Sequence, residues 1–389
     1  MLTAYTLNEL AWSIGSLALA LLVYRRTGSA LGAAAFFISS QFLPALISPA
    51  LVVRLDQLAA RRVLAVLYAL QALAFLALTW VASHFALVPV LALVLGGGIV
   101  ALAARAIARA ATAAVTAPAG LLRDGNAVMN TAFAFCIMAG PAIGAATVLA
   151  GGTSAALLAD SGIFVAIALT VATTGGLPGS LPAQDLVAGR LRAAVALANK
   201  DAMIRSLLAL QAVALVFFAM SIPVEVVFAQ HSLHAGAGGY GALLSVWGAG
   251  AIAGSAAYAR WRALPAMGLI ACSSAALGVG FLIMAAAPSL ALAIVGSALG
   301  GVGNGVEAVA VRTALQERVH QRWMALMMSL NDSLFQASPG PGILLGGAIA
   351  ALAGPRAAFA VGGVGALAIA ALAPIVMRAT KDAPSTAAD

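Results

Sequence analysis

Residues 87–104 read LVPVLALVLGGGIVALAA and contain no charged side chain. A transmembrane helix needs about twenty predominantly apolar residues, so this stretch and its neighbours are long enough to cross a bilayer. The whole chain has the same character, since 63% of its 389 residues are hydrophobic and only 8% are charged. A soluble domain has roughly a quarter charged residues. We therefore expect an all-α membrane protein with the lipid bilayer as its main solvent.

Twelve apolar runs of this kind follow one another along the chain. They predict transmembrane helices at 5–24, 29–53, 62–83, 86–114, 125–149, 154–176, 203–229, 237–259, 264–287, 289–313, 323–350 and 357–378. The first run lacks a basic segment before it, so we interpret it as a retained helix and not a cleaved signal peptide. The predicted domains are an N-terminal six-helix bundle at 1–176, a central cytoplasmic loop with a short helix at 177–202, a C-terminal six-helix bundle at 203–380 and a polar tail at 381–389.

The basic residues predict how these helices are oriented. If both termini are cytoplasmic, all 20 lysines and arginines except Arg25, Arg26 and Arg356 fall at segments on the cytoplasmic side. Such a bias is the positive-inside rule of membrane proteins. It predicts a multi-pass protein of the cell (inner) membrane with both termini in the cytoplasm. The basic residues sit in short clusters between apolar runs, which argues against a nucleic-acid partner despite the net charge of +8.

The two halves of the chain also repeat some features. Gly140-Pro141 and Gly340-Pro341 occupy corresponding predicted helices, and Arg62 and Arg262 recur at the same offset. Parallel repeats of this kind are a known plan of secondary transporters. We therefore predict two six-helix pseudo-repeats.

Three local stretches carry a resemblance to a known family. Residues 23–30 read VYRRTGSA, residues 55–62 read LDQLAARR, and residues 140–144 read GPAIG. In these stretches, and in its twelve predicted helices, the chain resembles the major facilitator superfamily, and within it the drug–proton antiporter branch that includes macrolide and enterobactin exporters. Val52 and Gln57 stand where the signature loop of that superfamily normally has a glycine and a basic residue.

The resemblance assigns roles to two of these stretches. Asp56, Arg61 and Arg62 would form a gating loop, in which an acid accepts charge-assisted hydrogen bonds in one access state; the alternative is a solvated turn with orienting arginines. In the helix-five motif, Gly140, Pro141 and Gly144 would permit a kink and tight helix packing. That motif is typical of exporters in the family, and ordinary packing is its alternative.

Ionisable residues at membrane depth are functional candidates because they are expensive to place there. The candidates for proton coupling or a substrate cavity are Glu9, Arg105, Asp160, Glu225, Glu307 and Asp332, with Asn304 and Asn331 as polar neighbours. Our leading hypothesis is that Asp332 and Glu307 take part in proton coupling or in binding a cationic substrate. The alternative is structural pairing, such as Glu307 or Glu9 with Arg105.

Together these features predict a secondary active transporter. The family resemblance implies proton-coupled efflux of a lipophilic small molecule by alternating access, with protons as the coupling ion and a monomeric protein. Uptake or exchange of a small metabolite on the same fold, and a membrane sensor that no longer transports, stay open. The sequence has no phosphate-binding loop and no recognisable nucleophile or metal motif, so we expect no enzyme activity, no cofactor and no metal.

Overall fold

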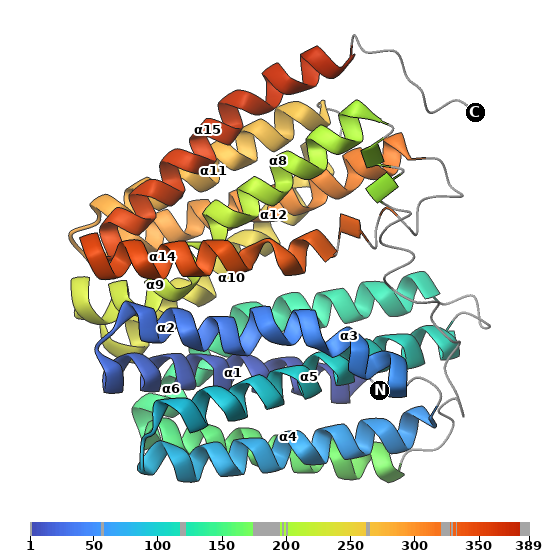
Figure 1. Ribbon diagram of the computed structural model, residues 1–389, viewed down its shortest axis with the longest axis vertical. Coiled ribbons are helices and arrows are strands. Elements are labelled where there is room, and N and C mark those ends of the chain that lie inside the picture. Colours follow the sequence, from blue (N-terminus) through green and yellow to red (C-terminus); the bar gives the residue numbers. More distant parts are fainter. Residues whose placement is uncertain are drawn as a thin grey trace. The chain divides into compact units, whose positions relative to one another are not determined.

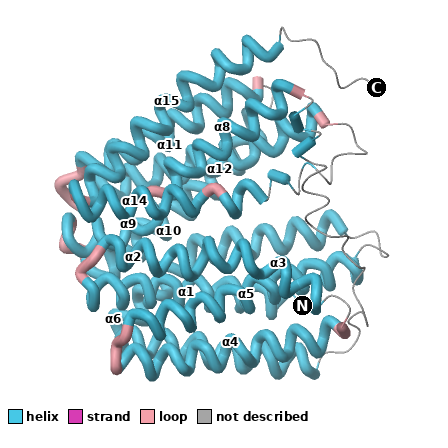
Figure 2. The backbone as a smooth tube through the Cα atoms, viewed as in Figure 1, coloured by secondary structure: helices cyan, strands magenta, loops and turns pink. Residues whose placement is uncertain are grey.

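Every element in the described part of the computed structural model is a helix (Figure 1; Figure 2). The structure describes residues 2–55, 58–116, 122–173, 195–196, 198–199, 201–261, 265–319, 327, 330–331 and 333–381. The chain forms two compact units. Unit 1 comprises Met1–Gln184 and Ala235–Ser245, and unit 2 comprises Asp185–His234 and Val246–Asp389. The domain bounds expected from the sequence stay a prediction, because the central loop and the tail lie almost wholly outside the described residues.

The helices of unit 1 come from the first half of the chain. They are α1 (Leu2–Thr27), α2 (Ala30–Phe37), η1 (Ile38–Phe42), α3 (Leu43–Leu55), α4 (Ala60–Ser83), α5 (Leu87–Thr116) and α6 (Leu122–Thr173). Helix α6 packs against α1 and α4, and α4 packs against α5. These helices form the blue-to-green part of Figure 1.

Helix α6 covers two helices that the sequence predicted separately, at 125–149 and 154–176. The backbone departs from helical geometry at Gly152, where φ is 76° and ψ is −179°. A side chain makes this conformation unfavourable, and glycine adopts it readily. The two predicted helices therefore meet at a sharp kink with no loop between them.

The second predicted span contains an irregular turn that the sequence did not reveal. Its π-helical turn η1 joins α2 to α3, and the Leu43 N–H donates to the Ile38 carbonyl instead of one residue further along. Pro44 follows at once and has no N–H to offer the Ser40 carbonyl, which is a common cause of such a turn. Gly98 of α5 lies here, and a Cβ on it would stand 2.7 Å from Pro44 Cγ.

Unit 2 is built from the second half of the chain. Its helices are α8 (Ala202–Ala219), α9 (Ser221–Val227), η2 (Phe228–Ser232), most of α10 (Gly236–Trp261), α11 (Ala266–Ala286), α12 (Leu290–Arg318), α14 (Pro339–Ala353) and α15 (Pro355–Lys381). Asp201 caps α8, because its carboxylate accepts from the backbone N–H groups of Met203 at 2.8 Å and Ile204 at 3.0 Å. Such a cap satisfies donors that would otherwise be orphaned at a helix start.

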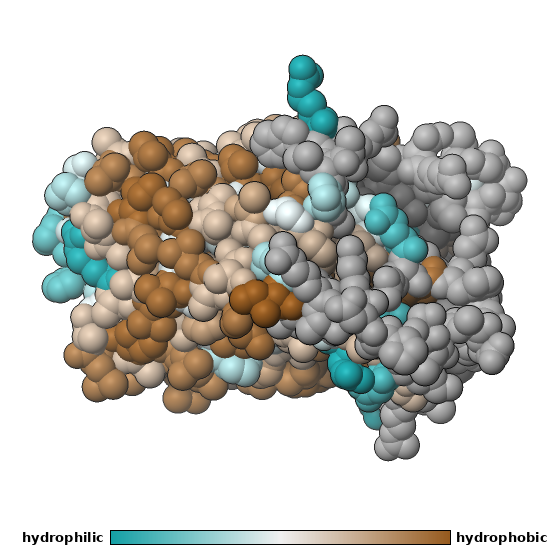
Figure 3. All heavy atoms as spheres, turned by 90° about the horizontal axis from the view of Figure 1, so that it is seen from above, coloured by the Kyte–Doolittle hydropathy of each residue, from teal (hydrophilic) through white to brown (hydrophobic). Residues whose placement is uncertain are grey.

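Ten of the described helices are long and apolar enough to cross a membrane. Helix α6 counts once where the sequence predicted two, and α14 has only 15 described residues. Large apolar side chains such as Trp80, Val88 and Leu352 are 68%, 76% and 89% exposed. Much of the face seen in Figure 3 is hydrophobic. The chain is an integral multi-pass membrane protein, and the exact number of twelve spans stays a prediction.

Candidate functional site: buried polar groups and two cavities

Glu9 and Arg105 form an ion pair inside unit 1. Arg105 of α5 donates from Nε to Glu9 Oε1 at 2.7 Å, and its Nη2 also contacts Glu9 Oε2. Asn8 Nδ2 adds a hydrogen bond to Glu9 Oε1 at 3.1 Å. The Glu9 side chain is only 3% exposed, whereas Arg105 is 27% exposed and lies over the Phe133 ring. The geometry is bidentate, which is the strongest form of this interaction.

A second contact lies one helical turn away on the same two helices. Arg109 donates from Nη2 to the Tyr5 hydroxyl at 2.8 Å and also lies over the Tyr5 ring. Tyr5 and Glu9 are four residues apart on α1, as are Arg105 and Arg109 on α5, so each pair shares one helix face. The two contacts join α1 and α5 in the way the structural-pairing alternative describes for Glu9.

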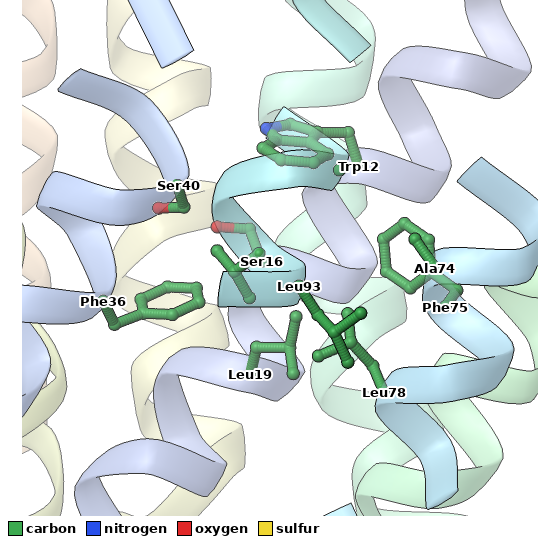
Figure 4. Close-up of a pocket in the computed structure, with 11 residues that line it drawn as sticks. Trp12, Ser16, Leu19, Phe36, Ser40, Ala74, Phe75, Leu78 and Leu93 are labelled. Atoms are coloured by element: carbon green, nitrogen blue, oxygen red, sulfur yellow. The ribbon is translucent and has the colours of Figure 1, made fainter. Parts of the chain in front are cut away.

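Unit 1 encloses an apolar cavity of about 320 Å³ (Figure 4). Its lining comes from α1, α2, η1, α4 and α5, and comprises Trp12, Ser16, Leu19, Phe36, Ser40, Ala74, Phe75, Leu78, Leu93, Val94 and Gly97. Only the Ser16 and Ser40 hydroxyls and the Trp12 indole N–H offer polar side-chain groups. The wall suits a hydrocarbon or aromatic group.

Unit 2 has a larger cavity of different chemistry, about 500 Å³ in volume. Its lining comprises Gln211, Ala214, Leu215, Phe218, Ser274, Leu277, Asn304, Glu307, Ala308, Val311, Phe335, Ala366 and Ile369. Glu307 and Asn304 lie three residues apart on α12 and therefore on one face of that helix. The Gln211 side-chain oxygen is buried without a hydrogen-bond partner. The cavity thus combines apolar walls with an acid and unused hydrogen-bonding capacity.

Asp160 is a third buried group, in the second half of α6 in unit 1. It is 0% exposed, and neither carboxylate oxygen has a hydrogen-bond partner. A Cβ added to Gly15 of α1 would stand 2.6 Å from Asp160 Oδ2 and would also clash with the Phe75 ring of α4. The carboxyl is therefore packed tightly between three helices of unit 1.

The helix-five motif is a packing surface in this structure. A Cβ on Gly140 would clash with Ser13 of α1, and one on Gly144 would stand 3.1 Å from Ile14 Cα. On the part of α10 that belongs to unit 1, a Cβ on Gly241 would stand 2.8 Å from the Pro141 carbonyl oxygen. Small residues let the helix backbones approach this closely.

The remaining predicted site residues have different positions. Glu225 is 7% exposed on α9, and Asn331 is 4% exposed with its side-chain oxygen unpaired. Arg61 and Arg62 are exposed at the start of α4. Asp332 and Asp56 lie outside the described residues, so their predicted roles stay untested. Among the residues that the structure describes, no group of three His, Cys, Asp or Glu side chains is arranged to hold a metal ion.

The structure therefore brings Glu9 to Arg105 in unit 1 and places Glu307 and Asn304 in one cavity of unit 2. Within unit 1, Asp160 forms no hydrogen bond with the Glu9–Arg105 pair. Sequence reasoning missed Gln211, Ser274 and the two phenylalanines of the unit 2 cavity. Each is a single polar or aromatic residue in an apolar run. The sequence of such a run does not show which face of the helix lines a cavity.

Comparison with known proteins defines the class of this fold. No protein-family model matches the chain, and no curated protein matches its sequence. Among solved structures, the nucleoside transporter NupG matches with a TM-score of 0.71 at 14% identity over 97% of both chains. A POT family transporter in complex with 5-aminolevulinic acid gives a TM-score of 0.74 at 10% identity, over 98% of this chain and 96% of that chain.

A third match is the human organic anion transporter MFSD10, with a TM-score of 0.66 at 18% identity over 96% of this chain and 98% of that chain. The chain has the all-α fold of major facilitator superfamily transporters. These three proteins are transporters by their names. The likeness establishes the fold and says nothing of the substrate.

Proposed function

We propose that this protein is a secondary active transporter that exports a lipophilic small molecule by alternating access in exchange for protons. The observation that carries the proposal is the unit 2 cavity, where Glu307 is set among apolar walls. The fold supports transport in general. The lining of the cavity supports a particular kind of substrate.

The lining of the cavity fits a small organic molecule. Ligand pockets typically have mostly apolar walls with a few polar groups. Phe218 and Phe335 provide aromatic surface, and Asn304 and Gln211 provide hydrogen-bonding groups. The acid favours a substrate with a positively charged or hydrogen-donating group. The preferred substrate class is therefore a lipophilic cation and not an organic anion.

The same cavity weighs against the two alternatives. Uptake or exchange of a polar nutrient favours a polar cavity with paired charges, whereas most of the lining here is aliphatic or aromatic. A sensor without transport has no need of cavities, and each unit encloses one. We further propose that the protein is a monomer in the cell membrane. The positive-inside bias supports cytoplasmic positions for both termini. The GPAIG motif supports membership of the drug–proton antiporter branch.

The proposal is tested with the purified protein in liposomes that carry a pH gradient. The probes are three lipophilic ions or molecules of similar size: tetraphenylphosphonium, tetraphenylborate and tetraphenylmethane. Accumulation of the cation alone, driven by the proton gradient and abolished by a protonophore, supports the proposal. Equal movement in protein-free liposomes, or gradient-driven transport of the anion only, contradicts it.

A matched pair of variants connects the activity to the cavity. Glu307→Gln removes the acid that lines it, and we expect about tenfold weaker binding of the cation, equivalent to about 1.4 kcal/mol. Glu317→Gln removes an exposed acid from the same helix and should leave binding unchanged. Equal binding by both variants would separate the substrate site from this cavity.

A further inference from the structure

Asp160 is an acid at membrane depth with nothing to balance its charge. Glu9, the other buried acid of unit 1, has a bidentate arginine and an asparagine beside it. Asp160 has neither, because both of its oxygens lack a hydrogen-bond partner at 0% exposure. An isolated carboxylate in such surroundings is far more costly than a neutral one, so the group takes up a proton instead.

The side chains described beside Asp160 do not suit a metal cation as its partner. Phe75 and Phe164 stack with ring centroids 5.4 Å apart, and Phe164 lies one turn after Asp160 on α6. Ser161 uses its hydroxyl to donate to the Ala72 carbonyl at 2.9 Å. A metal cation needs several oxygen ligands around it. The aromatic rings beside Asp160 cannot supply them, whereas a proton needs only the carboxylate itself.

The helices packed against this part of α6 carry other titratable groups, and the structure gives several of them partners. They are Tyr5, Glu9, Tyr24, Arg25 and Arg26 on α1, Arg61, Arg62 and Tyr68 on α4, and Arg105 and Arg109 on α5. Arg105 pairs with Glu9, and Arg109 bonds Tyr5. Among the described residues, none of these groups forms an ion pair or hydrogen bond with Asp160.

Two neighbouring features connect this acid with the unit 1 cavity. Phe75 lines that cavity. Its ring and Asp160 Oδ2 both lie beside Gly15, since a Cβ on Gly15 would clash with both. Gln71, one turn before Phe75 on α4, is 1% exposed, and neither atom of its amide has a partner. A buried amide without partners costs free energy. Packing alone therefore does not explain why Gln71 and Asp160 are polar. Movement of Phe75 would change both the cavity wall and the cover over the acid.

We propose that Asp160 is a proton-binding residue of the transport cycle, held here in a state closed to solvent. This inference rests on the proposed function and names one site of its coupling ion. A proton from water on one side of the membrane forms the carboxyl O–H bond. That bond breaks when the acid faces water on the other side, which returns the carboxylate and completes one proton transfer per cycle.

The first experiment needs no substrate. Infrared spectra of the purified protein at neutral pH should show the carbonyl band of a protonated carboxyl. The band should lose intensity in Asp160→Asn and keep it in Asp201→Asn, which has an equally good helix cap outside the membrane. If Asp160→Asn does not fold, isotope-labelled aspartate in the unaltered chain must shift the band. A band unchanged by both treatments would overturn the proposal.

The second experiment measures coupling with tetraphenylphosphonium in liposomes. Coupling between two sites commonly amounts to about 5–150-fold, and we expect Asp160→Asn to lose gradient-driven accumulation by a factor in this range. Exchange of the cation without a gradient should continue, because Glu307 and its cavity are intact. Accumulation equal to that of Asp201→Asn, or accumulation driven by sodium instead of protons, would contradict the proton site. Absence of transport by the unaltered protein would instead contradict the proposed function and leave the infrared result standing.

Discussion

The helices within unit 1 and the helices within unit 2 contact one another through different interactions. In unit 1, charged and hydroxyl side chains join α1 to α5 through Glu9–Arg105 and Tyr5–Arg109. In unit 2, α10 and α12 meet through glycines on both sides, because a Cβ on Gly254 would clash with Val302 and one on Gly305 would clash with Ala251. Lipid tails are as apolar as leucine, so helices in a bilayer associate through close packing and polar contacts. The Glu9–Arg105 pair of unit 1 is an example of a polar contact, and the α10–α12 contact of unit 2 is an example of close packing.

Aromatic rings add to the glycine contacts of unit 2. Trp247 of α10 lies between Phe218 and Phe281, with ring centroids 5.7 Å and 5.6 Å away. Phe359 continues the series from Phe281 to Phe228, and Arg356 ends it over the Phe228 ring. Trp247 also packs on Gly300. Such ring contacts contribute about 0.5–1.5 kcal/mol each beyond area burial.

The largest effect should come from filling the glycine contact of unit 2. In Gly305→Ala, the new methyl group would overlap the Ala251 backbone, which no rotamer change can relieve. We expect little folded protein, measured as the monodisperse fraction after detergent extraction. Gly144→Ala in unit 1 is the matched control, because its methyl group would stand 3.1 Å from Ile14 Cα and needs only a small shift. Equal yields of the two variants would remove the contrast between the units.

Breaking the ion pair of unit 1 should have the next largest effect. Arg105→Met leaves the Glu9 carboxylate buried without its partner, and removing one member of a buried pair costs about 3–5 kcal/mol. Because Arg105 is 27% exposed, we expect a loss near the lower end of that range. Thermal unfolding in detergent measures the change. The double variant Glu9→Leu/Arg105→Met should recover much of the loss, since no charge remains; a double variant as unstable as the single one would argue against the pair.

A smaller effect should follow from removing one hydroxyl at the neighbouring contact. Tyr5→Phe keeps the ring beneath Arg109 and removes only the acceptor of a 2.8 Å hydrogen bond. Interhelical hydrogen bonds in membrane proteins average about 0.6 kcal/mol, so the unfolding temperature should fall slightly. Tyr258→Phe, on α10 in unit 2, is the comparison variant. A larger loss of stability for Tyr258→Phe than for Tyr5→Phe would show that polar contacts matter more in unit 2 than in unit 1.

The smallest contrast concerns the start of α8 in unit 2. Asp201→Ala removes an N-cap and should lower stability by about 1 kcal/mol, while Asp201→Asn should have almost no effect. The same unfolding assay measures both. If both variants lose stability equally, the charge of Asp201 matters and its capping geometry does not.

The fold could be predicted because hydropathy and basic residues are properties of whole runs. Residues 87–104 are apolar throughout, and they lie inside α5 as expected. The Glu9–Arg105 pair could be anticipated as an alternative, since opposite charges at similar depth in lipid tend to find one another. The kink at Gly152 and the π-helical turn at Ile38–Phe42 could not, because each depends on local backbone geometry that apolar composition does not encode.

The candidate sites were harder to predict than the helices. Glu307 and Asp160 were chosen together from the sequence as acids at membrane depth. One lines a cavity with Asn304, and the other is enclosed between α1, α4 and α6 without a partner. Their difference arises from helix rotation and from what faces them across the bundle. The composition and residue spacing of a single helix do not predict its rotation or the residues that face it.

The turn η1 has a consequence for how insertions and deletions would act in the second span. A π-helical turn holds one residue more than the α-helix requires, and an α-helix advances about 100° per residue, from 3.6 residues per turn. Deleting one residue within Ile38–Phe42 would therefore let the span continue as a regular helix with Leu43–Leu55 in nearly the same orientation, whereas a deletion within Leu43–Leu55 would rotate the residues after it by about 100°. Pro44 would keep its place against Gly98, and the same stripe of α3 would face the lipid.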